Sequence, residues 1–324
     1  MNPKISIITP CFNAEKYIEQ TILSIINQGY DNLEYIIIDG GSTDGTVDVI
    51  KKYEDKISYW ISEPDKGQSE AINKGIKVAT GDVFNWINGD DFLLDGTLDL
   101  ISNQFKNHEI NVVCTQTQLL HPGGEITINP ITRNTGKLFD LLLDVGLNQQ
   151  GMYWKMECIR NLNGVNENFQ FSMDLDLWKR FLITYGNQKI VSLEIPTSVF
   201  RLHEESKTGI NFEESKIFFD RENHAAYIHY AKFAGPKYLK NINLLFPEVD
   251  ENLAKKNAIS TLSAEFIKKW LNYLFFKKAT TFFYANQYKI AHQLMKNMDR
   301  KFISTSDLKN YKSFRRWSFL KKYL

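Results

Sequence analysis

The chain has 324 residues, of which 43% are hydrophobic and 24% charged, and its formal net charge is +1. These values are typical of a soluble globular protein, and no uninterrupted apolar stretch reaches the ~20 residues that a membrane span needs. Three scattered cysteines without a CxxC spacing argue against a disulfide framework and a zinc site. Because the N-terminus also has no long apolar run of the signal-peptide kind, we expect a cytoplasmic protein.

The charge is distributed unevenly along the chain. Residues 251–324 hold 16 Lys and Arg against 4 Asp and Glu, a net charge of +12, so the first 250 residues carry −11. An acidic front and a basic, aromatic tail suggest two functions. A nucleic-acid partner is not expected, because the basic tail has no known nucleic-acid-binding motif and the front is acidic.

The first half of the chain alternates strand-like and helix-like segments, which predicts a parallel sheet with crossover helices. The expected strands cover residues 4–9, 33–38, 57–61 and 83–87, and the expected helices cover residues 14–27, 46–53 and 68–78. Pro10 is expected to stop the first strand. Four successive apolar residues, Tyr35 to Ile38, predict a second strand that is covered on both faces.

The pattern is looser in the second half. A strand at 112–117 precedes the turn formers of 121–124, which predict a hairpin, and residues 147–154 are expected to be extended. A helix is expected from 173 to about 185, followed by two strands at 189–195 and 197–202. Beyond about Glu213 the sequence predicts helices throughout, after a boundary in the linker at 206–209.

Polar residues and glycines follow each of the first four expected strands. These clusters occupy residues 9–13, 39–45, 63–67 and 88–91. Ligands bind at the carboxyl edge of open α/β sheets, so the clusters predict a polar pocket there. In the last cluster, the adjacent carboxylates of Asp90 and Asp91 repel each other unless a cation or proton intervenes. Such oxygen ligands suit Mg²⁺ or Mn²⁺ with phosphate, and the alternative is a solvated turn that caps the helix near Thr97.

The ordered set of motifs resembles glycosyltransferase family 2 over roughly residues 4–205. The matching segments are SIITPCFN (6–13), IDGGSTDGT (38–46), SEPDKGQSEAINKG (62–75), WINGDD (86–91), MDLDLW (173–178) and RLH (201–203). The resemblance implies an α/β fold of the GT-A type, a Rossmann-like, mostly parallel sheet flanked by helices, followed by a C-terminal helical extension. It is nearest to the bacterial branch that acts on capsule, O-antigen or exopolysaccharide precursors.

The resemblance also implies a domain organisation. Residues 1–208 would form the catalytic domain, with nucleotide-sugar binding in 1–110 and the acceptor side in 111–208. Residues 209–324 would form a helical region rich in basic and aromatic residues. Gln149 and Gln150 lie where this branch has acceptor-side residues.

The segment from Asn88 to Asp91 takes the place of the family's DxD motif, which binds the donor diphosphate through Mn²⁺ or Mg²⁺. Asn88 replaces the first acid of that motif. The resemblance implies Asp90 as the main metal ligand and Asp91 as a second ligand or an orienting residue. His203 matches a position near the diphosphate, where it would bind metal or phosphate, and a surface histidine is the alternative.

The resemblance implies that Asp39 pairs with the nucleobase, usually uracil, and its alternative is a turn residue before Thr46. Phe12 offers a stacking face for the base. The residues expected to bind the nucleotide come from four loops and are Pro10, Phe12, Asn13, Asp39, Asp65, Asn88 and Asp90.

Asp174 matches the family's catalytic aspartate, although Met173 replaces the glutamate that normally precedes it. Inverting transfer needs one carboxylate to take the proton of the acceptor hydroxyl. Asp176 lies on the same helical turn and is the competing candidate. Either carboxylate is also explained as a helix N-terminal acid favoured by the macrodipole.

Together these features predict an inverting, metal-dependent glycosyltransferase of the hexosyl or N-acetylhexosaminyl type. Its donor would be a UDP-linked nucleotide sugar, and its acceptor a lipid-linked glycan or oligosaccharide in surface polysaccharide biosynthesis. The basic, aromatic tail predicts contact with an anionic membrane surface, or alternatively a packed helical bundle. Two other functions stay open: a non-catalytic relative that binds glycan or nucleotide, and a sugar nucleotidyltransferase, which the lack of a glycine-rich loop after the first strand disfavours.

Overall fold

The computed structural model describes residues 2–131, 137–143, 147–204, 206–207, 212–247, 263–303 and 311–316. The chain divides into two compact units, Met1–Lys216 and Ile217–Leu324. The first unit contains the sheet and the second is helical.

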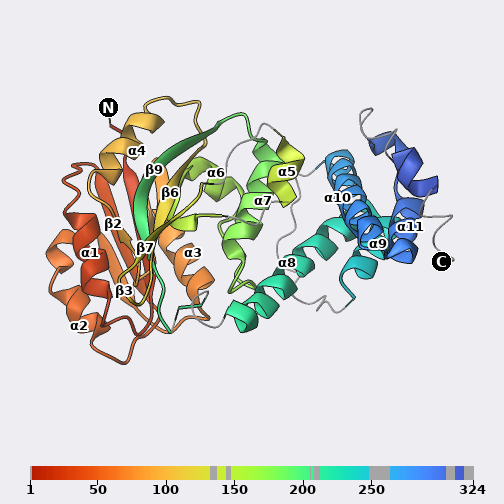
Figure 1. Ribbon diagram of the computed structural model, residues 1–324. Coiled ribbons are helices and arrows are strands. Elements are labelled where there is room, and N and C mark those ends of the chain that lie inside the picture. The colour runs from red at the N-terminus through yellow and green to blue at the C-terminus, as the bar shows by residue number, and fades with distance from the viewer. Residues whose placement is uncertain are drawn as a thin grey trace. The chain divides into compact units, whose positions relative to one another are not determined.

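The described part of the N-terminal unit contains one nine-stranded sheet (Figure 1). Its strands are β1 (Ile5–Cys11), β2 (Leu33–Asp39), β3 (Tyr59–Ser62), β4 (Val83–Trp86), β5 (Phe92–Leu93), β6 (Val112–Leu120), β7 (Ile126–Asn129), β8 (Met152–Lys155) and β9 (Ile190–Arg201). The order is β3-β2-β1-β4-β8-β6-β9-β5, with β7 paired to β6. The first four strands are parallel, and β8 runs antiparallel to both β4 and β6. The predicted α/β sheet is therefore confirmed.

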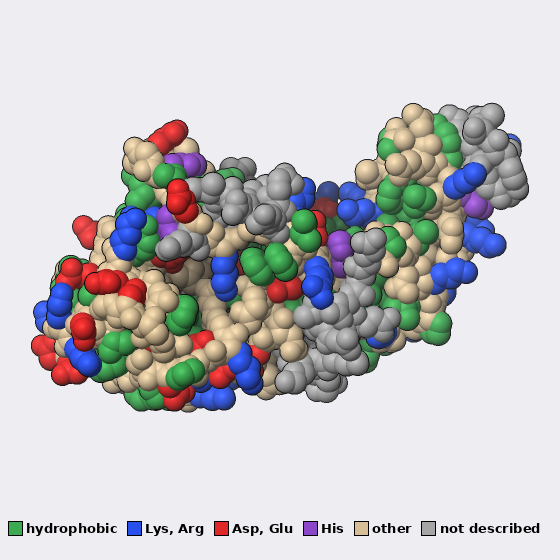
Figure 2. Space-filling model, turned by 90° about the horizontal axis from the view of Figure 1, so that it is seen from below, with side chains coloured by type: hydrophobic (Ala, Val, Ile, Leu, Met, Phe, Trp, Pro, Cys, Tyr) green, Lys and Arg blue, Asp and Glu red, His purple; other side chains and the backbone are tan. Residues whose placement is uncertain are grey.

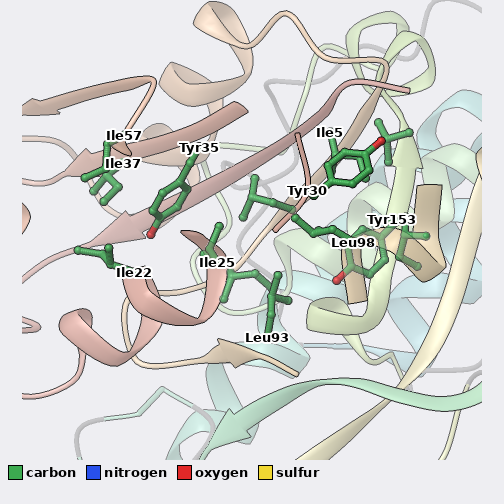
Figure 3. Packing of buried hydrophobic residues seen from close by; sticks show 14 of the residues in the cluster. Ile5, Ile22, Ile25, Tyr30, Tyr35, Ile37, Ile57, Leu93, Leu98 and Tyr153 are labelled. Atoms are coloured by element: carbon green, nitrogen blue, oxygen red, sulfur yellow. The ribbon is translucent and has the colours of Figure 1, made fainter. Parts of the chain in front are cut away.

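Helices cover both faces of this sheet. They are α1 (Ile18–Ile26), α2 (Thr46–Lys51), α3 (Gln68–Val78), α4 (Thr97–Phe105), α5 (Leu138–Leu143), α6 (Met156–Asn161) and α7 (Met173–Tyr185), with two short 3₁₀ turns, η1 (Glu54–Lys56) and η2 (Gln149–Gly151). On one face, Ile5 and Ile37 of the sheet lie in one buried cluster with residues of α1, α2 and α4 (Figure 3). On the other face, α3 approaches β1 closely because Gly75 has no side chain: a Cβ there would lie 2.6 Å from Ile8 Cγ2.

Three expectations about the strands were wrong. Strand β1 runs through Pro10 to Cys11. The carbonyl of Pro10 accepts a hydrogen bond from Gly89 N (3.2 Å) in the turn after β4. Because the amide and carbonyl of one strand residue point to the same side, the missing N–H of Pro10 faces this turn, and no bond to β2 is lost.

The other two differences lie in the second half of the sheet. The two strands expected at 189–195 and 197–202 form the single strand β9, whose pairing with β6 shifts register around Gln116, a β-bulge. The segment 147–154 is only partly extended, because residues 149–151 form the 3₁₀ turn η2. The hairpin at 121–124 and the helix at 173–185 are confirmed.

The C-terminal unit is a helical bundle in the part that the structure describes. It contains most of α8 (Phe212–Ala234), then α9 (Pro236–Leu245), α10 (Ala264–Tyr284), α11 (Tyr288–Asn297) and the 3₁₀ turn η4 (Arg300–Phe302). Trp270 and Phe275 of α10 are buried in its core. The Asn272 amide in α10 donates to Tyr238 Oη of α9 (3.0 Å) and accepts from Asp299 N (2.7 Å), which fixes the register of neighbouring helices.

None of the helices in the described ranges is both long enough and apolar enough to cross a bilayer. Figure 2 shows Lys and Arg side chains recurring over the visible face of the C-terminal unit. Of the tail expected to touch a membrane, residues 304–310 and 317–324 lie outside the described residues.

Candidate functional site

The acidic turn Asn88–Asp91 directly follows the buried strand β4. The turn is closed by a hydrogen bond from Asp91 N to Asn88 O (3.1 Å). Gly89 lies against β1, where an added Cβ would be 2.8 Å from Cys11 Cβ. The small residue therefore allows the turn to sit at the carboxyl edge of β1, where the sequence predicted the polar pocket.

Asp91 anchors this turn from inside the protein. Its side chain is fully buried, and Oδ2 accepts from Gln150 Nε2 (2.9 Å) and Asn88 Nδ2 (3.0 Å). Its Oδ1 accepts from the backbone N–H of Arg201 (3.0 Å). Burial, and then the neighbouring Asp90 carboxylate, raise the pKa of Asp91 well above its usual range. Of the two expected roles, this geometry matches the orienting residue.

Asp90 is the more accessible acid of the turn. Its Oδ2 lies 2.9 Å from His203 Nε2, and its backbone carbonyl accepts from Arg201 Nε (3.0 Å). The His203 ring packs on Tyr17 with centroids 4.7 Å apart, and the Arg201 guanidinium lies 4.9 Å from the centre of the same ring. Tyr17, which the sequence analysis treated only as part of a helical stripe, therefore positions both side chains beside Asp90.

The ligand chemistry of this pair fits a divalent cation that arrives with phosphate. Asp90 supplies a carboxylate, and His203 supplies an imidazole next to it. Within the described ranges, no group of three or more His, Cys, Asp or Glu side chains is placed to hold a metal ion. Mg²⁺ commonly binds through one or two carboxylates and completes its shell with substrate phosphate and water.

Asp39 ends β2 with its side chain fully buried. Its Oδ2 accepts from the amides of Gly41 (3.1 Å) and Ser42 (2.9 Å) and from Ser62 Oγ (2.6 Å), and Oδ1 accepts from Ser42 Oγ (2.5 Å) and the Cys11 thiol (3.6 Å). A carboxylate has about four acceptor positions, so these donors occupy it fully. Asp39 thus organises the turn after β2, as its alternative role requires.

The loop that follows β1 meets the loop that follows β2 beside Asp39. Asn13 adopts a left-handed conformation (φ +47°), and its Oδ1 accepts from Thr43 N (2.9 Å). The backbone N–H of Asn13 donates to Ser42 Oγ (2.7 Å). Phe12 is 62% exposed, so its ring is available to a ligand at this edge. Pro10, by contrast, is buried within β1.

The loop that follows β3 places Asp65 against the loop that follows β2. Its Oδ1 accepts from Gly67 N (2.7 Å), and a Cβ added to Gly40 would lie 2.9 Å from its Oδ2. The absence of a side chain at Gly40 therefore makes room for this carboxylate. Burial raises the pKa of Asp65. The residues expected to bind nucleotide in the first three loops are thus brought together.

Helix α7 presents Asp174 and buries Asp176. Asp174 lies in the first turn of α7 and is half-buried. Asp176 is buried and accepts from Arg180 Nε (2.7 Å), and the same guanidinium donates to Leu162 O (2.6 Å) and Gly164 O (2.9 Å). The buried ion pair of Asp176 with Arg180 therefore stabilises the fold, whereas Asp174 stays partly exposed at the start of α7.

The segment that leads into α7 is held against α3. Ser69 Oγ donates to Phe169 O (2.5 Å), and Asn73 Nδ2 donates to Val165 O (3.0 Å). Gln68, at the start of α3, donates to Asn88 Oδ1 (2.6 Å) and so connects the third loop to the acidic turn. The sequence analysis assigned Gln68 no role, although its place at the start of a helix on the carboxyl edge was a usable signal.

An open groove of about 560 Å³ lies between α1 and β5. Gln20 and Phe92 line it, and both contact Arg201: Gln20 Oε1 accepts from the guanidinium (2.5 Å), whose Cζ is 5.4 Å from the centre of the Phe92 ring. The groove therefore borders the acidic turn on the side of Arg201.

Comparison with known proteins adds independent evidence. Residues 6–142 match the family model for glycosyl transferase family 2. An uncharacterized glycosyltransferase of Haemophilus influenzae is 39% identical over 110 residues, which cover 33% of this chain and 44% of that protein. The putative teichuronic acid biosynthesis glycosyltransferase TuaG of Bacillus subtilis is 38% identical over 92 residues, which cover 28% of this chain and 36% of that protein. The chain spans about half the length of the curated relatives that it matches.

Among solved structures, the S. aureus TarS 1-349 complex with UDP has a TM-score of 0.55 and 15% identity, covering 98% of this chain and 88% of that chain. A TarS complex with UDP-GlcNAc gives 0.53 and 16%, covering 98% and 89%. These likenesses show the fold. Together with the match of residues 6–142 to the model for glycosyl transferase family 2, they define a GT-A fold.

Proposed function

We propose that the protein is a metal-dependent, inverting glycosyltransferase that uses a UDP-linked sugar. The observation that carries this proposal is the Asp90–His203 pair (2.9 Å) on the turn after β4, at the carboxyl edge of the domain that matches the model for glycosyl transferase family 2. The UDP and UDP-GlcNAc complexes of TarS, which shares the fold, support the choice of nucleotide.

Asp90 and His203 would hold Mn²⁺ or Mg²⁺. When bound, the cation supplies positive charge to the departing diphosphate. Asp91 keeps Asp90 in place through its bonds to Gln150 and to the backbone of Arg201. The buried turn thus orients the acid before the donor arrives, which lowers the cost of assembling the site.

The first three loops would bind the nucleoside. Phe12 offers an exposed ring to the base, and Asn13 and Asp65 fix the loops on either side of the turn after β2. Asp39 Oδ2 accepts a hydrogen bond from the hydroxyl of Ser62, which lies on another strand. On nucleotide binding, the imide N–H of uracil would replace this hydroxyl as the donor to Asp39.

Asp174 would act as the general base. It takes the proton of the acceptor hydroxyl while the oxygen forms a bond to the anomeric carbon. The bond from that carbon to the diphosphate oxygen breaks, and its electron pair stays on the diphosphate. Asp176 is kept from this role by its ion pair with Arg180.

The acceptor would be a lipid-linked glycan or oligosaccharide in surface polysaccharide synthesis, at a membrane that the basic C-terminal region contacts. The name of the relative TuaG supports a role in a cell-envelope polymer. Residues 251–324 carry a net charge of +12, which favours an anionic surface. Part of this region is committed to the bundle, since Trp270 and Phe275 are buried.

Calorimetric titration of the full chain with UDP, with and without Mn²⁺, tests the donor half of the proposal. We expect Mn²⁺ to strengthen UDP binding and to leave uridine binding unchanged, because uridine has no phosphate for the cation to bridge. If UDP binds equally well in excess chelator, the metal role is wrong. If neither compound binds, the nucleotide role is wrong.

A further inference from the structure

Helix α1 holds the backbone of the chain segment that follows β4. Thr21 and Ser24 lie on one face of α1, and Gln28 follows about one turn later, just past the end of the helix. Each of these side chains forms a hydrogen bond with a backbone group of the segment 89–94. In chain order, Thr21 Oγ1 donates to Gly89 O (3.0 Å) and Asp91 O (2.6 Å), Leu93 N donates to Ser24 Oγ (3.1 Å), and Gln28 Nε2 donates to Leu94 O (2.9 Å). The acidic turn is therefore fixed to α1 as well as to β9.

The hydroxyl of Thr21 is directed at the acidic turn. A threonine hydroxyl inside a helix often bonds to the carbonyl four residues earlier. Here that carbonyl, of Tyr17, accepts from the backbone N–H of Thr21 (3.3 Å). The Thr21 side chain is buried, and its hydroxyl donates instead to the carbonyls of Gly89 and Asp91. Because these two residues flank Asp90, the hydroxyl determines where the backbone lies on both sides of Asp90.

Tyr17 lies four residues before Thr21, at the N-terminal cap of α1, and contacts the second member of the Asp90–His203 pair. Its ring packs against the His203 ring with centroids 4.7 Å apart and an interplanar angle of 40°. Residues four apart share a helix face, so the start of α1 contacts the backbone around Asp90 through Thr21 and the imidazole through Tyr17. The 2.9 Å spacing between the carboxylate and the imidazole therefore depends on α1.

We propose that Thr21 and Tyr17 are positioning residues for the cation of the donor, Thr21 through Asp90 and Tyr17 through His203. The inference rests on the proposed function, since the pair that they position is the proposed metal site. A metal ligand must be held within about 0.5 Å of its productive position, so the loss of either contact weakens the hold on the cation. The proposed nucleoside contacts use other side chains, so only the metal-dependent part of the UDP affinity changes.

Paired substitutions separate positioning from packing. Thr21→Val removes the hydroxyl at nearly constant volume, and Thr21→Ser keeps it. Tyr17→Leu removes the ring beside His203, and Tyr17→Phe keeps it. Thr97→Val is the matched control, because Thr97 is also buried and its hydroxyl also donates to a backbone carbonyl, Thr197 O (2.8 Å), between α4 and β9. UDP and uridine affinities are measured by calorimetry with and without Mn²⁺, and stability is measured by urea unfolding.

We expect Thr21→Val and Tyr17→Leu each to weaken UDP binding in Mn²⁺ by about tenfold to a hundredfold, the usual range for residues that orient a metal ligand. Uridine binding should stay unchanged in both variants. Thr21→Ser and Tyr17→Phe should stay close to the wild type. Thr97→Val should lower the stability and keep the wild-type response to Mn²⁺.

Wild-type Mn²⁺ dependence in both Thr21→Val and Tyr17→Leu would overturn the inference and leave the proposed metal site standing. Equal losses of UDP and uridine affinity would also overturn it, because the two contacts would then serve the whole site. If Thr21→Val does not fold, Tyr17→Leu decides in the same way. If UDP binding by the wild type does not respond to Mn²⁺, the proposed metal role itself fails, and the inference fails with it.

Discussion

Asp90 Oδ2 and His203 Nε2 lie 2.9 Å apart although 113 positions separate them in the sequence. The contact joins the turn after β4 to the end of β9. In the described site, a partly exposed carboxylate and an imidazole meet at this contact, and we propose that the metal ion binds here.

The His203 side chain can be tested apart from the fold. We expect His203→Asn to weaken Mn²⁺-dependent UDP binding by about tenfold and to leave uridine binding unchanged, because removing one ligand lowers the affinity for the ion rather than for the base. Calorimetric titration with each compound measures both. Equal Mn²⁺ dependence in the variant and the wild type would rule out His203 as a ligand.

Asp174→Asn should lower turnover by about a hundredfold to ten-thousandfold, because a general base contributes that much to a proton transfer. UDP affinity should stay unchanged, since the role that we propose for Asp174 concerns the acceptor and not the nucleotide. Single-turnover assays and UDP titrations separate the two effects. Retention of wild-type turnover would remove Asp174 as the base.

Asp176→Asn is expected to act on stability. The substitution leaves the buried Arg180 guanidinium without its carboxylate, and breaking a buried ion pair costs roughly 3–5 kcal/mol. Urea unfolding measures the loss, with Asp174→Asn as the control on the same helical turn. Equal stability of the two variants would contradict the structural role of Asp176.

Lys179 predicts a pH dependence of stability. Burial lowers the pKa of this ammonium from 10.5 to about 7, and Asp176 opposes the shift. Between pH 7 and 10.5 the unfolded chain therefore binds more protons than the folded chain, so the free energy of unfolding rises with pH. Urea unfolding of the wild type and Lys179→Met at pH 6.5 and 9 tests this. The stabilising effect of methionine should shrink as the pH rises, and an equal difference at both values would show that Lys179 does not titrate in this window.

Asp39→Asn should weaken uridine binding, because asparagine cannot accept from all the donors that now surround the carboxylate. Ser62→Ala is the matched control, since it removes one donor and leaves the carboxylate in place. Titration with uridine measures both variants. Unchanged affinity in Asp39→Asn would separate Asp39 from the base site.

Local sequence signals predicted the sheet well and the contacts across it poorly. Runs of apolar residues such as Tyr35 to Ile38 identified buried strands, since a strand covered on both faces needs no alternation. Pro10 misled because its effect depends on which neighbour its missing N–H faces, and only the pairing of strands decides that.

The acidic positions of the site were visible in the motifs, but their surroundings were not. The i,i+4 spacing of Asp176 and Arg180 is typical of an ion pair on a helix, so this contact was predictable from the sequence. The contacts of Gln68 with Asn88 and Lys207, by contrast, join segments 20 and 139 positions apart. No periodicity encodes such distances, so these residues emerge only from the folded chain.

The Asp91 carboxylate accepts hydrogen bonds from two separate segments, from the side chain of Gln150 in η2 and from the backbone N–H of Arg201 in β9. Both donors belong to segments that follow β4 in the chain, whereas the neighbouring Asp90 carboxylate is partly exposed. A substitution that displaces η2 therefore transmits its shift directly to Asp90. The β6–β7 hairpin belongs to the same unit of contacts, since Thr115 Oγ1 donates to Gly151 O and Asn148 Nδ2 donates to Asn129 O. A substitution at Gln150 is therefore expected to change the position of Asp90 even though, in the described part of the chain, the two side chains do not touch the same partner.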